Sequence, residues 1–139
     1  MKQKYLTKKY EGMSWSEVAD APVSAISGVS ESDAADLKEA FGIDTIRELA
    51  GNRYLCLAQG INSFSKATGQ ILDKSFNSKD YDELRKLPVH AISGVSEGDG
   101  KLLKKAFGID TIQELAENQY VCVAQTIVTL AFLESLLSE

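Results

Sequence analysis

The chain has 139 residues, 44% of them hydrophobic and only two of them proline, so it is long enough for one or two small cores and is not disordered by composition. Lysine and arginine number 15 against 20 aspartates and glutamates. The resulting net charge of −5 disfavours purely electrostatic binding to nucleic acid or to an anionic membrane.

The N-terminal segment is basic, in contrast to the rest of the chain. Lys2, Lys4, Lys8 and Lys9 occur before Tyr10 with no acidic residue among them. We interpret residues 1–13 as a flexible, solubilising basic arm. The arm has no apolar core of the kind that a secretion signal needs, so we expect a cytoplasmic protein whose cysteines are reduced.

The rest of the chain is a duplication. A shift of 66 residues aligns Pro22–Ile61 with Pro88–Ile127 without a gap, and 28 of the 40 aligned residues are identical. We predict a first helical repeat at 14–67 and a second at 80–139, joined by a linker at 68–79. Both repeats are expected to form one compact domain.

Helix starts and stops recur at equivalent positions in the two repeats. Gly42 and Gly108 should each end a helix, and Asp44 and Asp110 should open the next one. Other expected helix starts are cap-like residues placed three positions before an acid. They are Ser14, Ser30, Asp80 and Ser96. No segment alternates with a period of two, so we predict an all-α protein of eight to ten short helices around a pseudo-two-fold axis.

The C-terminal stretch Tyr120–Leu137 is apolar enough to imitate a membrane span. It contains Gln125 and Glu134, and its longest run without a polar side chain is shorter than the ~20 residues that a span needs. We therefore predict a buried helix and no membrane contact.

Each repeat contains ISGVSE, followed by AFGIDTI and then by a glutamate, leucine and alanine. These strings resemble the helix-hairpin-helix superfamily over about 30 residues in each repeat. In DNA-binding members the resemblance implies a hairpin of the form Gly-apolar-Gly, whose amides hold a phosphate at a helix N-terminus. The matching hairpin residues here are Gly28, Val29 and Ser30 in the first repeat and Gly94, Val95 and Ser96 in the second.

The hairpins depart from that pattern because serine replaces the second glycine. Acids follow the serines: Glu31 and Asp33 in one repeat, Glu97 and Asp99 in the other. Carboxylates at a helix start repel phosphate and are typical helix caps. The sequence therefore favours a hairpin that connects two helices over one that binds phosphate.

The only cysteines, Cys56 and Cys122, occupy equivalent positions. Cysteine between aliphatic residues on a helix is typically a small core residue, so we expect both to be buried. The alternative is a redox or ligand pair. Two thiols fall short of the four ligands that zinc prefers, and His90 has Ser24 as its counterpart, so we predict no metal and no cofactor.

Gln59 and Gln125 are repeated on the same apolar helices. Each amide either hydrogen-bonds across the interface between repeats or faces water, and the sequence does not decide between the two.

The last helix of the second repeat is much more apolar than that of the first, and such a surface needs a cover. Either this helix is central to the molecule, or its apolar residues form a contact with another subunit or a partner. These residues are Val128, Phe132, Leu133, Leu136 and Leu137.

No catalytic motif or duplicated histidine occurs, so we expect that the protein is not an enzyme. Our leading hypothesis is a helical interaction or scaffold module that binds a protein partner or forms a homo-oligomer. The alternative is nucleic-acid binding by the hairpins and the basic arm, where Tyr5, Tyr10 and Trp15 supply aromatic rings among the lysines. A weaker alternative is a metal or cofactor held between the helices of Cys56 and Cys122.

Overall fold

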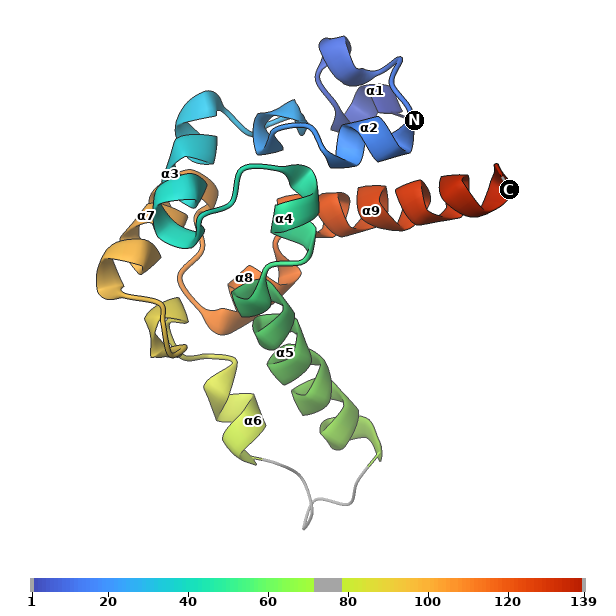
Figure 1. Ribbon diagram of the computed structural model, residues 1–139. Helices are drawn as coiled ribbons and strands as arrows, with labels where there is room; N and C mark the ends of the chain where they lie inside the picture. The colour runs from blue at the N-terminus through green and yellow to red at the C-terminus, as the bar shows by residue number, and fades with distance from the viewer. Residues whose placement is uncertain (1, 72–78, 139) are drawn as a thin grey trace.

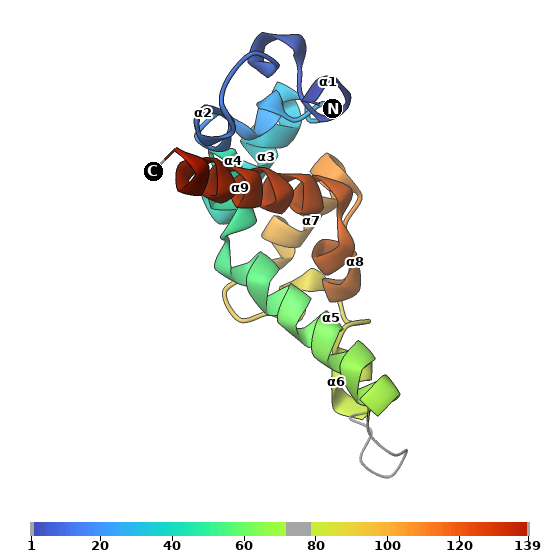
Figure 2. The same cartoon turned by 90° about the vertical axis from the view of Figure 1, so that its right-hand side faces the viewer.

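The computed structural model describes residues 2–71 and 79–138, and within them it contains helices and no β-strand. The all-α prediction is confirmed. Figure 1 shows two long helices, α5 (Arg53–Ile71) and α9 (Gln119–Leu137), that extend in different directions, with shorter helices beside each of them. Figure 2 shows the same two long helices from the side, crossing the molecule at different levels.

The first repeat and the arm before it contain four α-helices and two 3-10 helices that connect them, followed by one long helix. They are α1 (Lys2–Tyr5), η1 (Lys8–Tyr10), α2 (Trp15–Ala19), η2 (Val23–Ala25), α3 (Glu31–Phe41), α4 (Ile46–Ala50) and α5 (Arg53–Ile71). The described part of the second repeat follows the same order. Its elements are α6 (Lys79–Leu84), η4 (Val89–Ala91), α7 (Glu97–Phe107), α8 (Ile112–Glu117) and α9 (Gln119–Leu137).

The predicted caps form at Ser14, Ser30 and Ser96, where each hydroxyl accepts a hydrogen bond from the amide three residues on and the acid there accepts one from the serine amide. The predicted starts at Asp44 and Asp110 are wrong by one residue. Thr45 and Thr111 are the N-caps of α4 and α8. Asp44 and Asp110 instead form ion pairs with lysines of the preceding helices.

The predicted glycine stops are also confirmed. Gly42 and Gly108 follow α3 and α7 with φ of 70°, the left-handed conformation that a helix-ending glycine adopts without steric cost.

The long helices exchange partners between the repeats. Helix α5 of the first repeat packs on α6 and α8 of the second, and α9 of the second repeat packs on α2 and α4 of the first. Helices α3 and α7 pack against each other. The largest fully buried side chains come from both repeats, among them Ile46, Leu55 and Ile112, so the core is shared.

Residues 2–13 are docked on the protein, which corrects our interpretation of the N-terminal arm as flexible. Leu6 is only 3% exposed and belongs to the core. The Thr7 amide donates to the Ala25 carbonyl at 2.9 Å, and the Ser27 amide donates to the Tyr5 carbonyl at 2.7 Å. The arm therefore docks along the start of the first hairpin, because burial of Leu6 and these backbone bonds oppose the entropy of a free tail.

The linker was predicted at 68–79, yet α5 continues as far as Ile71 and α6 begins at Lys79. The helical segments thus extend into both ends of the predicted linker, and 72–78 lie outside the described residues. Helices α5 and α9 each have 19 residues, so the expectation that all helices are short is wrong for these two.

The prediction of a buried C-terminal helix holds for only one face of α9. Val121, Ala124, Ile127 and Ala131 are buried. Only 22% of the most apolar 18-residue stretch of α9 is buried. By length and composition alone, α9 is able to cross a membrane. Its C-terminal half runs along α2 and continues to the edge of the molecule (Figure 1).

Candidate functional site

The two hairpins have nearly the same backbone geometry. Gly28 and Gly94 have φ of 97° and 96°, a conformation that side-chain-bearing residues rarely adopt. The next amide along each hairpin, that of Val29 or Val95, donates to the carbonyl three residues back at 3.1 and 3.0 Å respectively. Each hairpin is therefore a closed turn.

A tyrosine from the other repeat covers each hairpin glycine. The Tyr120 hydroxyl lies 3.4 Å from the Gly28 carbonyl oxygen, and the Tyr54 hydroxyl lies 3.5 Å from that of Gly94. A Cβ atom at Gly28 or Gly94 would approach these hydroxyl oxygens to 2.8 or 2.5 Å. The glycines are thus required both by the positive φ and by the close approach of the tyrosine ring.

Each tyrosine also packs against a phenylalanine of its own repeat. The ring centroids of Tyr54 and Phe41 are 4.9 Å apart, and those of Tyr120 and Phe107 are 4.8 Å apart. Arg53 donates to the Tyr54 hydroxyl at 2.8 Å. The contact of these tyrosines with the hairpins was not predicted from the sequence, although Tyr54 and Tyr120 occupy equivalent positions in the two repeats.

Two amides at the start of the helix after each hairpin already have partners within the protein. The Ser30 amide donates to Asp33 Oδ2 at 3.1 Å, and the Asp33 amide donates to Ser30 Oγ at 3.0 Å. Ser96 and Asp99 repeat both bonds at the same distances. A phosphate bound at the Ser30 or Ser96 amide would have to displace a carboxylate.

The open question on Gln59 and Gln125 is resolved by reciprocal hydrogen bonds. Each side-chain amide nitrogen donates to the other's oxygen at 2.8 Å. Gln125 also donates to the Ala50 carbonyl at 3.2 Å, and Gln59 to the Ala116 carbonyl at 3.4 Å. The pair therefore joins α5 to α9 and reaches α4 and α8.

The expectation that both cysteines are buried is wrong. Cys56 on α5 and Cys122 on α9 are exposed and form no disulfide. Both helices place aliphatic neighbours rather than the thiol towards the core, for example Leu55 and Val121. Within 2–71 and 79–138 no group of three His, Cys, Asp or Glu side chains is arranged to hold a metal ion.

The residues predicted for a partner contact lie in the C-terminal half of α9. Phe132 is 61% exposed and Leu137 87% exposed, Leu133 and Leu136 are also exposed, and Val128 is half-buried against the core. The helix end is held in place by Glu134, whose carboxylate accepts from the Trp15 amide at 3.0 Å and from the Ser16 amide at 3.1 Å. The exposed side chains are thus displayed on a fixed helix.

Two buried polar residues were not singled out from the sequence. Asp36 on α3 and Asn62 on α5 are buried, and in each one side-chain oxygen has no hydrogen-bond partner among the described residues. Their counterparts in the second repeat are Leu102 and Val128, and this polar-for-apolar difference was the indication in the sequence.

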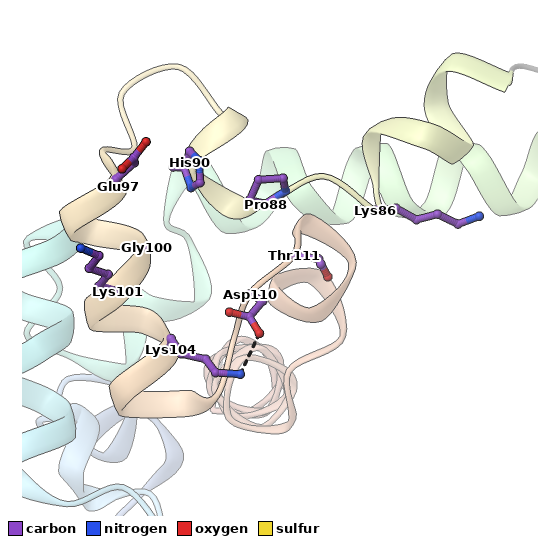
Figure 3. A pocket seen from close by; sticks show the side chains of 9 residues that line it. All are labelled: Lys86, Pro88, His90, Glu97, Gly100, Lys101, Lys104, Asp110 and Thr111. Atoms are coloured by element: carbon purple, nitrogen blue, oxygen red, sulfur yellow. Dashed lines mark hydrogen bonds and ion pairs between the residues drawn. The ribbon is translucent and has the colours of Figure 1, made fainter.

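A surface pocket of about 390 Å³ lies in the second repeat (Figure 3). Pro88 and His90 come from the start of η4 and η4 itself, Asp110 and Thr111 from the turn into α8, and Lys86 from the turn after α6. Helix α7 contributes the remaining lining residues, which are Glu97, Gly100, Lys101 and Lys104.

One ion pair joins two of the residues that line the pocket. Lys104 Nζ lies 2.7 Å from Asp110 Oδ2 (Figure 3). This hydrogen bond and the charge of Asp110 hold the pKa of the Lys104 ammonium above its ordinary value. Lys104 therefore remains charged at neutral pH.

Comparison with known proteins found no matching family model, no similar curated protein and no similar solved structure.

Proposed function

We propose that this chain is a non-catalytic interaction module that associates with a second copy of itself through the C-terminal half of α9. The observation that carries the proposal is the exposure of four large apolar side chains on the last six residues of that helix. They are Phe132, Leu133, Leu136 and Leu137.

The distribution of these side chains around α9 argues for a cover. Ala124, Ile127 and Ala131 face the core. At 100° per residue, Phe132 and Leu136 fall on one flank of that face, and Leu133 and Leu137 fall near the opposite side. A helix that is apolar all round is normally enclosed, and here the molecule's own helices enclose only part of it.

The spacing of the exposed side favours another helix as the cover. Val123, Thr126, Leu130, Leu133 and Leu137 are separated by alternating steps of three and four residues, the spacing by which paired helices interlock. The first three of these residues line an apolar pocket of about 270 Å³ together with Tyr5 and Trp15. This stripe of five residues thus begins at the apolar pocket and ends with the exposed Leu133 and Leu137.

A second copy offers the matching helix. Its α9 has the same stripe, so two copies bury each other's apolar surface in an isologous contact. The acidic body of each copy, with a net charge of −9 outside the first ten residues, also complements the exposed Lys4, Lys8 and Lys9 of its neighbour's arm.

We also propose that the chain is built from two helix-hairpin-helix-like units related by a pseudo-two-fold axis, and that the hairpins serve as scaffold. The support is the reciprocity of the contacts between Tyr54 and Gly94 and between Tyr120 and Gly28, together with the Gln59–Gln125 pair. The resemblance is carried by the closed Gly28 and Gly94 turns between helical segments.

The association is tested by sedimentation velocity of the wild type and of Leu133→Asp over a concentration series. We expect the wild type to shift from monomer to dimer with concentration and Leu133→Asp to remain monomeric, because a buried unpaired carboxylate opposes the contact. Leu57→Asp is the matched control, since Leu57 is 50% exposed on α5, outside the stripe. Circular dichroism checks that both variants are folded.

A wild type that stays monomeric at every concentration would contradict self-association, as would equal losses in Leu133→Asp and Leu57→Asp. Flotation of the monomer with phosphatidylcholine–phosphatidylserine vesicles, abolished by Leu133→Asp, would overturn the proposal in favour of a lipid surface.

A further inference from the structure

Several residues that line the pocket in the second repeat differ from those at the equivalent positions of the first. Five lining positions keep the same residue in both repeats, as in Pro22 and Pro88 or Lys38 and Lys104. Four differ. In the first repeat the counterparts of Lys86, His90, Gly100 and Lys101 are Asp20, Ser24, Ala34 and Ala35.

Two of these four differences, Asp20 to Lys86 and Ala35 to Lys101, change the charge, and both make the second repeat more positive. With His90 neutral, the pocket has three lysines against Glu97 and Asp110, a net charge of +1. The equivalent set in the first repeat has Lys38 against three acids, a net charge of −2. A change of three charge units at one place, in a chain with an acidic body, favours an anionic ligand.

Glycine at position 100, where the first repeat has Ala34, leaves room beside His90. A Cβ atom at Gly100 would lie 3.8 Å from His90 Nδ1, in van der Waals contact, so the glycine leaves that edge of the imidazole accessible. Gly100 lies on the second turn of α7, where glycine weakens a helix and alanine would be preferred. The residue that widens the pocket is therefore one that disfavours the helix.

Two of the side chains that differ from the first repeat have no partner in the described part of the chain. Neither the Lys101 ammonium nor the His90 ring forms a hydrogen bond or ion pair there, whereas Lys104 is paired with Asp110 and Lys86 lies 3.4 Å from Asp82. Lys101 and His90 are thus available to a ligand, and Lys104 and Lys86 add longer-range positive charge.

We infer that this pocket binds a small phosphate-bearing metabolite. Lys101 and His90 donate to the phosphate oxygens, since charge-assisted hydrogen bonds of this kind are among the strongest in proteins. Glu97 and Asp110 accept hydrogen bonds from hydroxyl groups of the same ligand. The volume of about 390 Å³ lies within the range of small-molecule sites.

The test is a two-dimensional NMR titration of the ¹⁵N-labelled full chain with glycerol 3-phosphate. Glycerol and sodium chloride at matched ionic strength are the controls for the neutral and the ionic part of the probe. We expect saturable shifts of the Gly100 and Lys101 amides and of the His90 ring, because His90 is the only histidine in the chain. Neither control should reproduce them.

Two variants restore the residue of the first repeat. Lys101→Ala and His90→Ser should each weaken binding about tenfold, as expected for one charge-assisted hydrogen bond. Both side chains are exposed, so the fold should tolerate the changes. Lys38→Ala on α3 is the matched control and should leave the affinity unchanged.

Shifts that grow linearly with concentration and spread over unrelated lysines would overturn the inference, as would an equal loss of affinity in Lys38→Ala. Shifts that sodium chloride reproduces would show general screening of charge and would also overturn it.

Discussion

The two repeats keep the same residues in their reciprocal contacts and differ at the pocket around His90 and at the end of α9. The hairpin glycines, the tyrosines that cover them and the Gln59–Gln125 pair are the same in both copies. Four residues that line the pocket around His90 and the apolar residues at the end of α9 have different counterparts in the first repeat. The reciprocal contacts therefore use the same residues in both copies, whereas the contact between α3 and α7 and these outer surfaces do not.

The strongest test of the shared contacts is Gly94→Ala. The substitution combines an unfavourable φ of 96° with a Cβ that would approach the Tyr54 hydroxyl to 2.5 Å. We expect the free energy of unfolding to fall by about 3 kcal/mol, the sum of backbone strain and overpacking. Chemical denaturation followed by circular dichroism measures the change.

Gly108→Ala separates the two causes. Gly108 also has a positive φ, 70°, but a Cβ there would meet nothing within 4 Å. We expect a loss of about 1 kcal/mol from the conformation alone. Equal losses in the two variants would remove the tyrosine contact from the explanation.

The glutamine pair should show coupling in a double-mutant cycle. Gln59→Leu or Gln125→Leu alone should lower the free energy of unfolding by about 2 kcal/mol, because the remaining amide loses both hydrogen bonds to its partner. The double variant should cost less than the sum of the single variants. Additive losses in thermal or chemical denaturation would argue that the two amides act independently.

Asp36 allows the repeats to be compared by exchange, because its counterpart is Leu102. Asp36→Leu should raise the free energy of unfolding by about 1 kcal/mol, since it removes a buried carboxylate oxygen that has no hydrogen-bond partner in the described part of the chain. Its ion pair with Lys105 is long, at 3.7 Å, and Lys105 is exposed. A destabilised variant in chemical denaturation would indicate that the ion pair outweighs the cost of burial.

The smallest effect concerns pH. Hydrogen bonds from the Asp44 and Thr45 amides lower the pKa of Glu48 below its ordinary value of 4.5. A lowered pKa in the folded state contributes stability above pH 4.5 that is lost as the pH falls through the folded-state pKa. Glu48→Gln should therefore flatten the acid side of the melting-temperature profile.

Much of the local structure was predictable from single residues. The serine caps at Ser14, Ser30 and Ser96 and the glycine stops at Gly42 and Gly108 depend on neighbours within a few positions, so the chain order alone identifies them. The one-residue error at Asp44 arose because threonine and aspartate are both good caps. In the structure Thr45 caps α4 and Asp44 forms an ion pair with Lys38.

The contacts between repeats were not predictable in the same way. The tyrosine on each hairpin glycine and the exposure of Cys56 and Cys122 depend on which helix faces which, and that choice is made by residues far apart in the chain. The docked arm is a similar case, because Leu6 finds its place against Ile26 only in the folded state.

The most direct test of the proposed interface is amide hydrogen exchange of the wild type at a low and a high protein concentration, read by mass spectrometry. We predict that residues 128–137 of α9 become more protected at high concentration, because a second helix covers the stripe. The exchange of residues 53–64 of α5 should not change. Equal exchange of 128–137 at both concentrations would contradict it.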